Sequence, residues 1–331
     1  MEKSRKIKAL RTLAAAALAL ALCLSTVWAL PKSLVPLGEA VGVELRAPGA
    51  IVAGFAADGS PALASGVRAG DLITALDGQP VGSAEDFPAA LERAGASVTL
   101  TIVREGRTLC LDVTPIDNDE GRRLGLWLRS GMSGIGTVTF VDPATGFFGA
   151  LGHPVSDADT GSPLPLGEGF VTPAEITAVR RGEAGEPGEL GGSFDPASPR
   201  GTVLCNTACG LFGYLDGAPG GEPVPVAAER EIVPGAATIR CTVEGSDPAE
   251  YAVRIDQVRR GETRTLSFTV TDPRLLAKTG GVVQGMSGSP ILQNGKLVGA
   301  VTHVTVADPT RGFGVSLERM YAEWEKTETA A

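Results

Sequence analysis

The stretch GMSGSPILQNGKLVGAV, residues 285–301, joins a glycine-flanked serine to a strand-like apolar run. Gly285 has no side chain, so the backbone can turn tightly and point the amides of Gly285 and Ser287 into a pocket beside the Ser287 hydroxyl. This pattern is typical of a serine protease nucleophile with an oxyanion hole. A hydroxyl is a poor nucleophile at neutral pH, so a histidine base and an orienting carboxylate are required. Ser289 is the alternative nucleophile, but it precedes a proline and lacks a glycine two positions earlier.

The chain has only two histidines. His153 ends the segment TVTFVDPATGFFGALGH (137–153), which predicts a hairpin with the histidine at the exit of its second strand. His303 lies in GAVTHVTV (299–306), where strand alternation would bury it or turn it toward a neighbouring sheet. We therefore expect His153 to be the base and His303 to be structural.

Three aspartates are candidates for the carboxylate. Asp157 and Asp159 follow the first histidine in HPVSDADTG, whereas Asp272 precedes Ser287 by 15 residues. An aspartate so close in sequence to the histidine more often ties its own loop through bonds to the backbone. The residues alone do not choose among the three.

The composition favours a β-rich, two-domain protein. A chain of 331 residues with 43% hydrophobic and 20% charged residues can form two domains with cores of their own. The net charge of −9 argues against a nucleic-acid partner and favours protein partners. Only 5% of the residues are aromatic, whereas 44 glycines and 23 prolines suit many short strands joined by tight turns.

The N-terminus predicts membrane targeting. Five basic residues lie within residues 3–11, and residues 12–30 carry no charge. This pattern fits either a cleaved signal peptide or a membrane anchor over residues 1–30, and in both cases the remainder is exported. Cys23 follows the bulky Leu22, so we do not expect lipidation.

The other cysteines are Cys110, Cys205, Cys209 and Cys241. An exported chain can form disulfides, and Cys205 and Cys209 form a CxxxC pair that could hold a metal. The spacing favours buried free thiols instead, because no compact set of further ligands accompanies the pair. We expect no metal and no cofactor.

After a short linker at 31–38, residues 39–117 have the pattern of a small domain. VGVEL (41–45) predicts a strand entered through a glycine, SGVRAGDLITALDGQPV (65–81) a hairpin, and residues 98–116 a final pair of strands. This order resembles a PDZ domain. In such domains a peptide adds as a strand beside the glycine-entry strand, which here would use Val41, Gly42, Val43, Glu44 and Leu45. The alternative is a module that only packs against its neighbour.

Two further segments carry a second resemblance. GALGHPVSD (149–157) and TDPRLLAKTGGVVQGMSGSPILQNGKLVGAVTHV (271–304) are similar to the stage IV sporulation protein B (SpoIVB) serine peptidase family. The resemblance implies a PDZ domain followed by a chymotrypsin-like double β-barrel at 118–321, and we expect a solvated tail at 322–331.

Matching the motifs assigns the catalytic roles. By this resemblance His153 is the base, Asp272 the orienting acid and Ser287 the nucleophile, with the amides of Gly285 and Ser287 as the oxyanion hole. The family also implies a sporulation signalling protease, exported from the forespore into the space between two membranes and tethered there until it cleaves itself. It then cleaves a regulatory subunit of the membrane SpoIVF complex, which triggers pro-sigma-K processing.

Three other classes of protein compete with this interpretation. An envelope quality-control protease usually places its PDZ domains after the protease domain. A non-catalytic PDZ scaffold would not need the histidine, the aspartate and the glycine-framed serine together. A metal-dependent hydrolase would need a ligand set that two distant histidines do not provide.

Overall fold

The computed structural model describes residues 30–57, 59–118, 121–157, 159–217, 220–262 and 265–330. Strands dominate the described chain, as the composition predicts. The predicted signal peptide or anchor and Cys23 lie outside these residues, apart from Leu30. Within the described ranges, no helix has the length and apolar character needed to cross a membrane.

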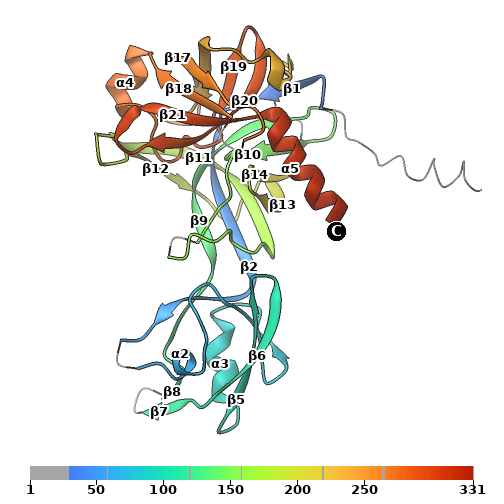
Figure 1. Ribbon diagram of the computed structural model, residues 1–331, viewed down its shortest axis with the longest axis vertical. Helices are drawn as coiled ribbons and strands as arrows, with labels where there is room; N and C mark the ends of the chain where they lie inside the picture. The colour runs from blue at the N-terminus through green and yellow to red at the C-terminus, as the bar shows by residue number, and fades with distance from the viewer. Residues whose placement is uncertain are drawn as a thin grey trace, which may run out of the picture. The chain divides into compact units, whose positions relative to one another are not determined.

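Residues 235–316 contain a closed antiparallel barrel of six strands, coloured orange to red in Figure 1. Its order is β16 (Gly235–Cys241), β17 (Ala249–Val258), β18 (Leu266–Val270), β21 (Asp308–Ser316), β20 (Lys296–Thr305) and β19 (Pro290–Gln293). Alternate side chains fill the barrel: Tyr251, Val253 and Ile255 of β17 are buried and the residues between them are exposed. Helix α4 (Pro273–Thr279) joins β18 to the loop that precedes β19.

A second ring of six strands precedes this barrel. It runs through β2 (Ala40–Phe55), β9 (Leu126–Val141), β10 (Phe147–Ala150), β14 (Gly210–Leu215), β13 (Gly201–Thr207) and β11 (Glu168–Arg180). The pairing of β2 with both β9 and β11 closes the ring. Its core includes Val43, Leu45, Phe148 and Leu211. The predicted double β-barrel is thereby confirmed, and so is the hairpin that leads to His153.

Shorter strands extend the first barrel. β1 (Ser33–Pro36) pairs with β9 and with β15 (Val224–Pro225), and β12 (Glu189–Phe194) pairs with β11. A 3-10 turn, η1 (Glu229–Glu231), leads toward β16. The predicted linker at residues 31–38 is therefore wrong for most of its length, because β1 is a paired strand of the barrel sheet.

A small domain with its own core lies between β2 and β9. It contains α2 (Pro61–Ala64), β3 (Leu72–Leu76), β4 (Gln79–Pro80), α3 (Asp86–Glu92), β5 (Val98–Arg104), β6 (Arg107–Val113), β7 (Ile116–Asn118) and β8 (Gly121–Arg123). Its core reaches from Ala50 to Leu124 and includes Phe87 and Leu91, the two buried residues of α3.

The small domain is an insertion into the first barrel. The first half of β2 pairs with β9 and β11 inside the barrel, from Ala40 to Arg46, and its second half enters the small domain. β9 returns along β2, and Figure 1 shows the two strands side by side. The predicted boundary at residue 39 is therefore wrong, because residues 40–46 belong to the barrel and not to the small domain.

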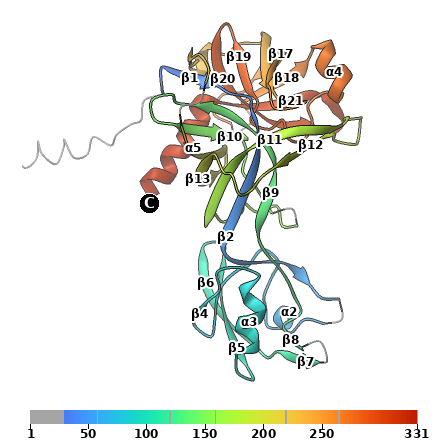
Figure 2. The ribbon, with the colours of Figure 1, turned by 180° about the vertical axis from the view of Figure 1, so that it is seen from behind.

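The last helix, α5 (Leu317–Ala330), packs on the first barrel, and Figure 2 shows it beside β13. Trp324 is buried, with its ring centroid 5.0 Å from that of Phe147 and 5.8 Å from that of Phe212. The predicted solvated tail at 322–331 is wrong for this reason. The sequence AEWEKTETAA is mostly polar, and its Trp324 attaches this end of α5 to the barrel, next to Tyr321, whose ring stacks on that of Phe140.

Candidate active site

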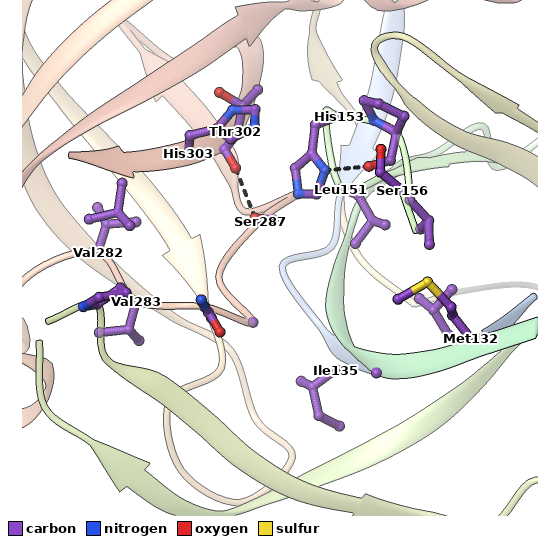
Figure 3. A pocket seen from close by; sticks show the side chains of 18 of the residues that line it. Met132, Ile135, Leu151, His153, Ser156, Val282, Val283, Ser287, Thr302 and His303 are labelled. Carbon is purple, nitrogen blue, oxygen red and sulfur yellow. Dashed lines mark hydrogen bonds between the residues drawn. The ribbon is translucent and has the colours of Figure 1, made fainter. Parts of the chain in front are cut away.

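One cavity of about 550 Å³ contains both the predicted base and the predicted nucleophile. His153 follows β10 of the first barrel, and Ser287 precedes β19 of the second. Residues of both barrels line the cavity, and Figure 3 shows the His153 ring turned toward Ser287. The structure thus brings together two residues that are 134 positions apart in the sequence.

The Ser287 loop is held by backbone bonds to both barrels. Thr137 of β9 donates its amide to the Ser287 carbonyl at 3.0 Å, and Gly288 donates to Val301 of β20 at 2.8 Å. The Ser287 hydroxyl donates to the Thr302 carbonyl at 2.8 Å. The loop position is therefore fixed from two sides, while the hydroxyl proton rests on a carbonyl and not on the base.

The amides of Gly285 and Ser287 are available as donors. Each of these amides shares a peptide group with the carbonyl of the preceding residue, and both of those carbonyls are hydrogen-bonded. The Gln284 carbonyl accepts from the Leu190 amide at 2.9 Å, and the Met286 carbonyl accepts from the Ser289 amide at 3.0 Å. In a trans peptide the N–H points opposite to the C=O. In the described part of the chain neither amide donates to a backbone carbonyl. Their role as an oxyanion hole stays a prediction that this geometry allows.

Ser289, the alternative nucleophile, has no exposed surface. Its hydroxyl donates to the Met286 carbonyl at 2.6 Å, which helps to hold the turn of the nucleophile loop. A buried hydroxyl engaged in this way cannot reach a substrate carbonyl, so the structure favours Ser287.

The His153 ring is oriented by a backbone carbonyl. Its Nδ1 lies 2.7 Å from the Pro154 oxygen. A carbonyl only accepts, so Nδ1 carries the hydrogen and Nε2 is left with its lone pair, as a general base requires. Burial lowers the pKa of His153, and the bond to Pro154 opposes this effect in part. The ring is therefore neutral at pH 7.

Of the two expected placements of His303, buried or turned toward a neighbouring sheet, burial is not observed. His303 is exposed, lines the same cavity, and its ring centroid lies 4.9 Å from that of His153. Strand alternation fails here because the pairing of β20 with β21 shifts register between Val301 and Val304.

Asp272 is not beside His153 in this structure. It is the N-cap of α4, and both of its oxygens are bonded: Oδ1 accepts from the amide and Nε of Arg274, and Oδ2 accepts from Nη2 of Arg274 and the amide of Ala252. It does not line the cavity. In this structure Asp272 has a capping role, because its carboxylate is engaged within its own barrel, and the orienting role that the resemblance implies stays a prediction.

The two other aspartates tie their own loop, as their spacing predicts. Asp157 is buried, and its Oδ1 accepts from the amides of Asp159 and Thr160. Arg129 lies 3.2 Å from Asp157 and also pairs with Asp159. Neither carboxylate lines the cavity.

Acid is expected to inactivate the site through His153. General-base catalysis needs the neutral ring, and burial moves the pKa of His153 below its usual 6.5. The value of kcat/KM should thus rise with pH and pass its midpoint below pH 6.5. A pH profile of peptide cleavage measures this, and an inflection above pH 7 would contradict it.

Asp272→Ala is expected to lower stability by about 1–2 kcal/mol, because α4 loses its N-cap. Hydrogen bonds from Arg274 hold the pKa of the Asp272 carboxyl far below its usual range. The stabilisation that the ionised Asp272 carboxylate gives to the folded protein is thus complete above about pH 4 and is lost as the pH falls further. Urea unfolding measures the effect, and Asp272→Asn, which keeps an acceptor, is the matched control.

The same variants test whether Asp272 acts only as the N-cap of α4. We expect Asp272→Asn to cleave peptides within a few-fold of the unchanged protein. A loss beyond about 100-fold with unaltered stability would return Asp272 to the catalytic machinery.

The predicted peptide-binding strand, Val41 to Leu45, has no free edge. Val41, Gly42, Val43, Glu44 and Leu45 pair with β11 on one side and with β9 on the other. This prediction is wrong, because a strand that is paired on both sides cannot accept another one.

A second groove in the small domain has the required geometry. A cavity of about 460 Å³ lies between α3 and the stretch from Leu124 to Leu128. In the described chain, β9 pairs only with β2 from Leu126 to Arg129. The apolar–glycine–apolar pattern occurs at residues 41–43 and again at 124–126, and only the fold shows which of these two stretches keeps a free edge.

The four described cysteines carry free thiols. Cys209 and Cys241 are buried, and burial raises their pKa to about 11 and about 12. Among the described residues, no group of His, Cys, Asp and Glu side chains could hold a metal ion.

Comparisons with known proteins agree on two parts of the chain. The sequence model of the SpoIVB peptidase S55 family matches residues 120–321, and that of a PDZ domain matches residues 56–104. A Pseudomonas putida protein named "Probable periplasmic serine endoprotease DegP-like" is 41% identical over 80 residues, which are 24% of this chain and 16% of that protein. The chain thus covers about a sixth of this relative's length.

Among solved structures, the active form of the Rv3671c protease from M. tuberculosis is 18% identical, with a TM-score of 0.34, covering 60% of this chain and 74% of that one. The PDZ domain of an SdrC-like protein from Listeria monocytogenes is 25% identical, with a TM-score of 0.22, covering 24% of this chain and 87% of that one. The PDZ match lies inside the inserted small domain, and the peptidase match covers more than half of the chain. The chain therefore belongs to the SpoIVB peptidase S55 family of serine peptidases, with a PDZ domain inserted in its first barrel.

Proposed function

We propose that this protein is an exported serine endopeptidase of sporulation signalling. It cleaves itself and then a regulatory subunit of the membrane SpoIVF complex, which triggers pro-sigma-K processing. One observation carries the catalytic part: His153, Gly285 and Ser287 line one cavity, and in the described chain the amides of Gly285 and Ser287 donate to no backbone carbonyl. The sporulation role, the export and the membrane tether follow from the family resemblance and the N-terminal sequence.

The geometry defines the first step of catalysis. The Ser287 hydroxyl rotates away from the Thr302 carbonyl toward Nε2 of His153 and attacks a peptide carbonyl as the histidine takes its proton. The Pro154 carbonyl accepts the Nδ1 hydrogen and stabilises the imidazolium. The amides of Gly285 and Ser287 hold the oxyanion, and His153 then protonates the leaving amine.

The PDZ domain supplies a second contact with protein substrates. A peptide segment adds as a strand to the free edge of β9 near Leu126 and packs against α3. Such a contact raises the effective concentration of the substrate at the active site. Binding of this kind suits a protease that acts on few partners, including its own chain.

An active-site serine reagent tests the catalytic proposal. A fluorophosphonate should modify the folded protein once, and peptide mass mapping should place the adduct on Ser287. Ser289→Ala should be labelled equally, and heat-denatured protein should not be labelled. If folded protein takes up no reagent at Ser287, a non-catalytic PDZ scaffold explains the chain better.

The purified regulatory subunit of the SpoIVF complex tests the substrate. Incubation should produce discrete fragments whose new ends are mapped by mass, and fluorophosphonate treatment should abolish them. An uncut subunit beside an enzyme that cleaves other peptides would remove this substrate and leave the peptidase in place.

A further inference from the structure

The cavity beside Ser287 has a wall of valine side chains. Val282 and Val283 precede the nucleophile by five and four residues, and Val304 belongs to β20. Val282 and Val283 are each 2% exposed, so packing fixes the shape of this wall. Figure 3 shows these two valines on the opposite side of Ser287 from His153.

This wall lies where a substrate side chain must go. The attacked carbonyl carbon approaches the Ser287 oxygen to about 3 Å, and its own oxygen must reach the Gly285 amide. The side chain of the same residue, called P1, branches about 1.5 Å from that carbon. One short segment, residues 282–287, carries the two valines, the amides that would hold the oxyanion, and the Ser287 nucleophile. A substrate bound to these amides therefore directs its P1 side chain onto Val282 and Val283.

The cavity has, along its described lining, no carboxylate, ammonium or guanidinium group that could pair with a charged side chain of a substrate. None of the described residues that line it is Asp, Glu, Lys or Arg. Its polar side chains, apart from the two histidines, are Ser133, Ser156, Gln284, Ser287 and Thr302. A charged P1 side chain would lose its hydration without gaining an ionic partner, whereas an apolar one would bury surface against valines.

We propose that this active site selects substrates with an apolar side chain, such as leucine or valine, at P1. The proposal rests on the proposed peptidase function and adds its substrate class. Val282, Val283 and Val304 determine the preference because they form the wall that the side chain meets.

A series of peptides that differ only at P1 tests this selection. We expect kcat/KM for leucine and valine to exceed that for aspartate and lysine by about 100-fold or more. Val304→Asp, at a half-buried position, should raise cleavage after lysine relative to leucine by about tenfold or more. Val233→Asp is the matched control, because Val233 is 47% exposed and does not line the cavity, so the preference should not change.

The outcomes separate this proposal from the function on which it rests. Equal cleavage after leucine, lysine and aspartate, abolished by the serine reagent, would overturn the apolar preference and keep the peptidase. Absence of cleavage in every peptide, together with no labelling of Ser287, would overturn the peptidase function itself.

Discussion

Ser287→Ala is expected to abolish both self-cleavage and peptide cleavage. Loss of a serine nucleophile lowers kcat by on the order of 10⁶-fold in a comparable triad enzyme. Here the Ser287 hydroxyl lines the same cavity as His153, and the neighbouring Ser289 cannot take its place because it is buried. N-terminal mass mapping of the exported chain, made in a host without relatives of this family, measures the effect.

Ser289→Ala is the matched control for this result. It removes a buried hydroxyl two residues away that donates to the Met286 carbonyl and also hydrogen-bonds with the Cys241 thiol. We expect a loss of about 1 kcal/mol in stability and retained cleavage. If Ser287→Ala is trimmed at the same sites as the unchanged chain, host enzymes make the cuts and self-cleavage is refuted.

Gly288→Ala is expected to destabilise the protein by about 2–5 kcal/mol and to eliminate cleavage. Gly288 has a φ of +98°, which side chains rarely adopt. A Cβ there would lie 2.0 Å from the Thr137 carbonyl oxygen and 2.6 Å from the Leu151 amide nitrogen. Both neighbours are backbone atoms of the first barrel, so the nucleophile loop must move instead, and Ser287 moves with it. Urea unfolding and peptide cleavage measure the two effects.

Gly295→Ala separates the destabilisation caused by the clash from that caused by the positive φ. Gly295 also has a positive φ, +73°, but a Cβ there would meet nothing within 4 Å. We expect a cost of about 1–2 kcal/mol and unchanged cleavage. Equal losses of stability in the two variants would show that the contact with Thr137 is unimportant.

Local signals predicted a chain of many short strands with tight turns, whereas the double barrel was expected from the family resemblance. Glycines at positive φ, alternating apolar residues and a short Asn294–Gly295 turn all act over a few residues. The hairpin before His153 was predicted for the same reason.

The failures all involve the choice of a partner far away in the sequence. Alternation makes Val41 to Leu45 a strand, but cannot tell whether β9 and β11 or a bound peptide pairs with it. Likewise an aspartate before a proline and a helix is an ordinary N-cap, and the capping signal at Asp272 was outweighed by its position in a family motif. The Pro154 carbonyl had no sequence signal, because every residue has one.

Residues 47–130 leave and re-enter the first barrel at neighbouring points, since Arg46 of β2 stands opposite Gly131 of β9. A two-residue turn has the length to join these ends as an ordinary hairpin, leaving the pairs from Ala40–Thr137 to Arg46–Gly131 in place. The module can thus be exchanged at one site in the gene with these strand pairs kept, provided that the replacement restores the core contacts of Ala47, Ile51 and Leu72. Recruitment of partners and cleavage are therefore free to evolve separately.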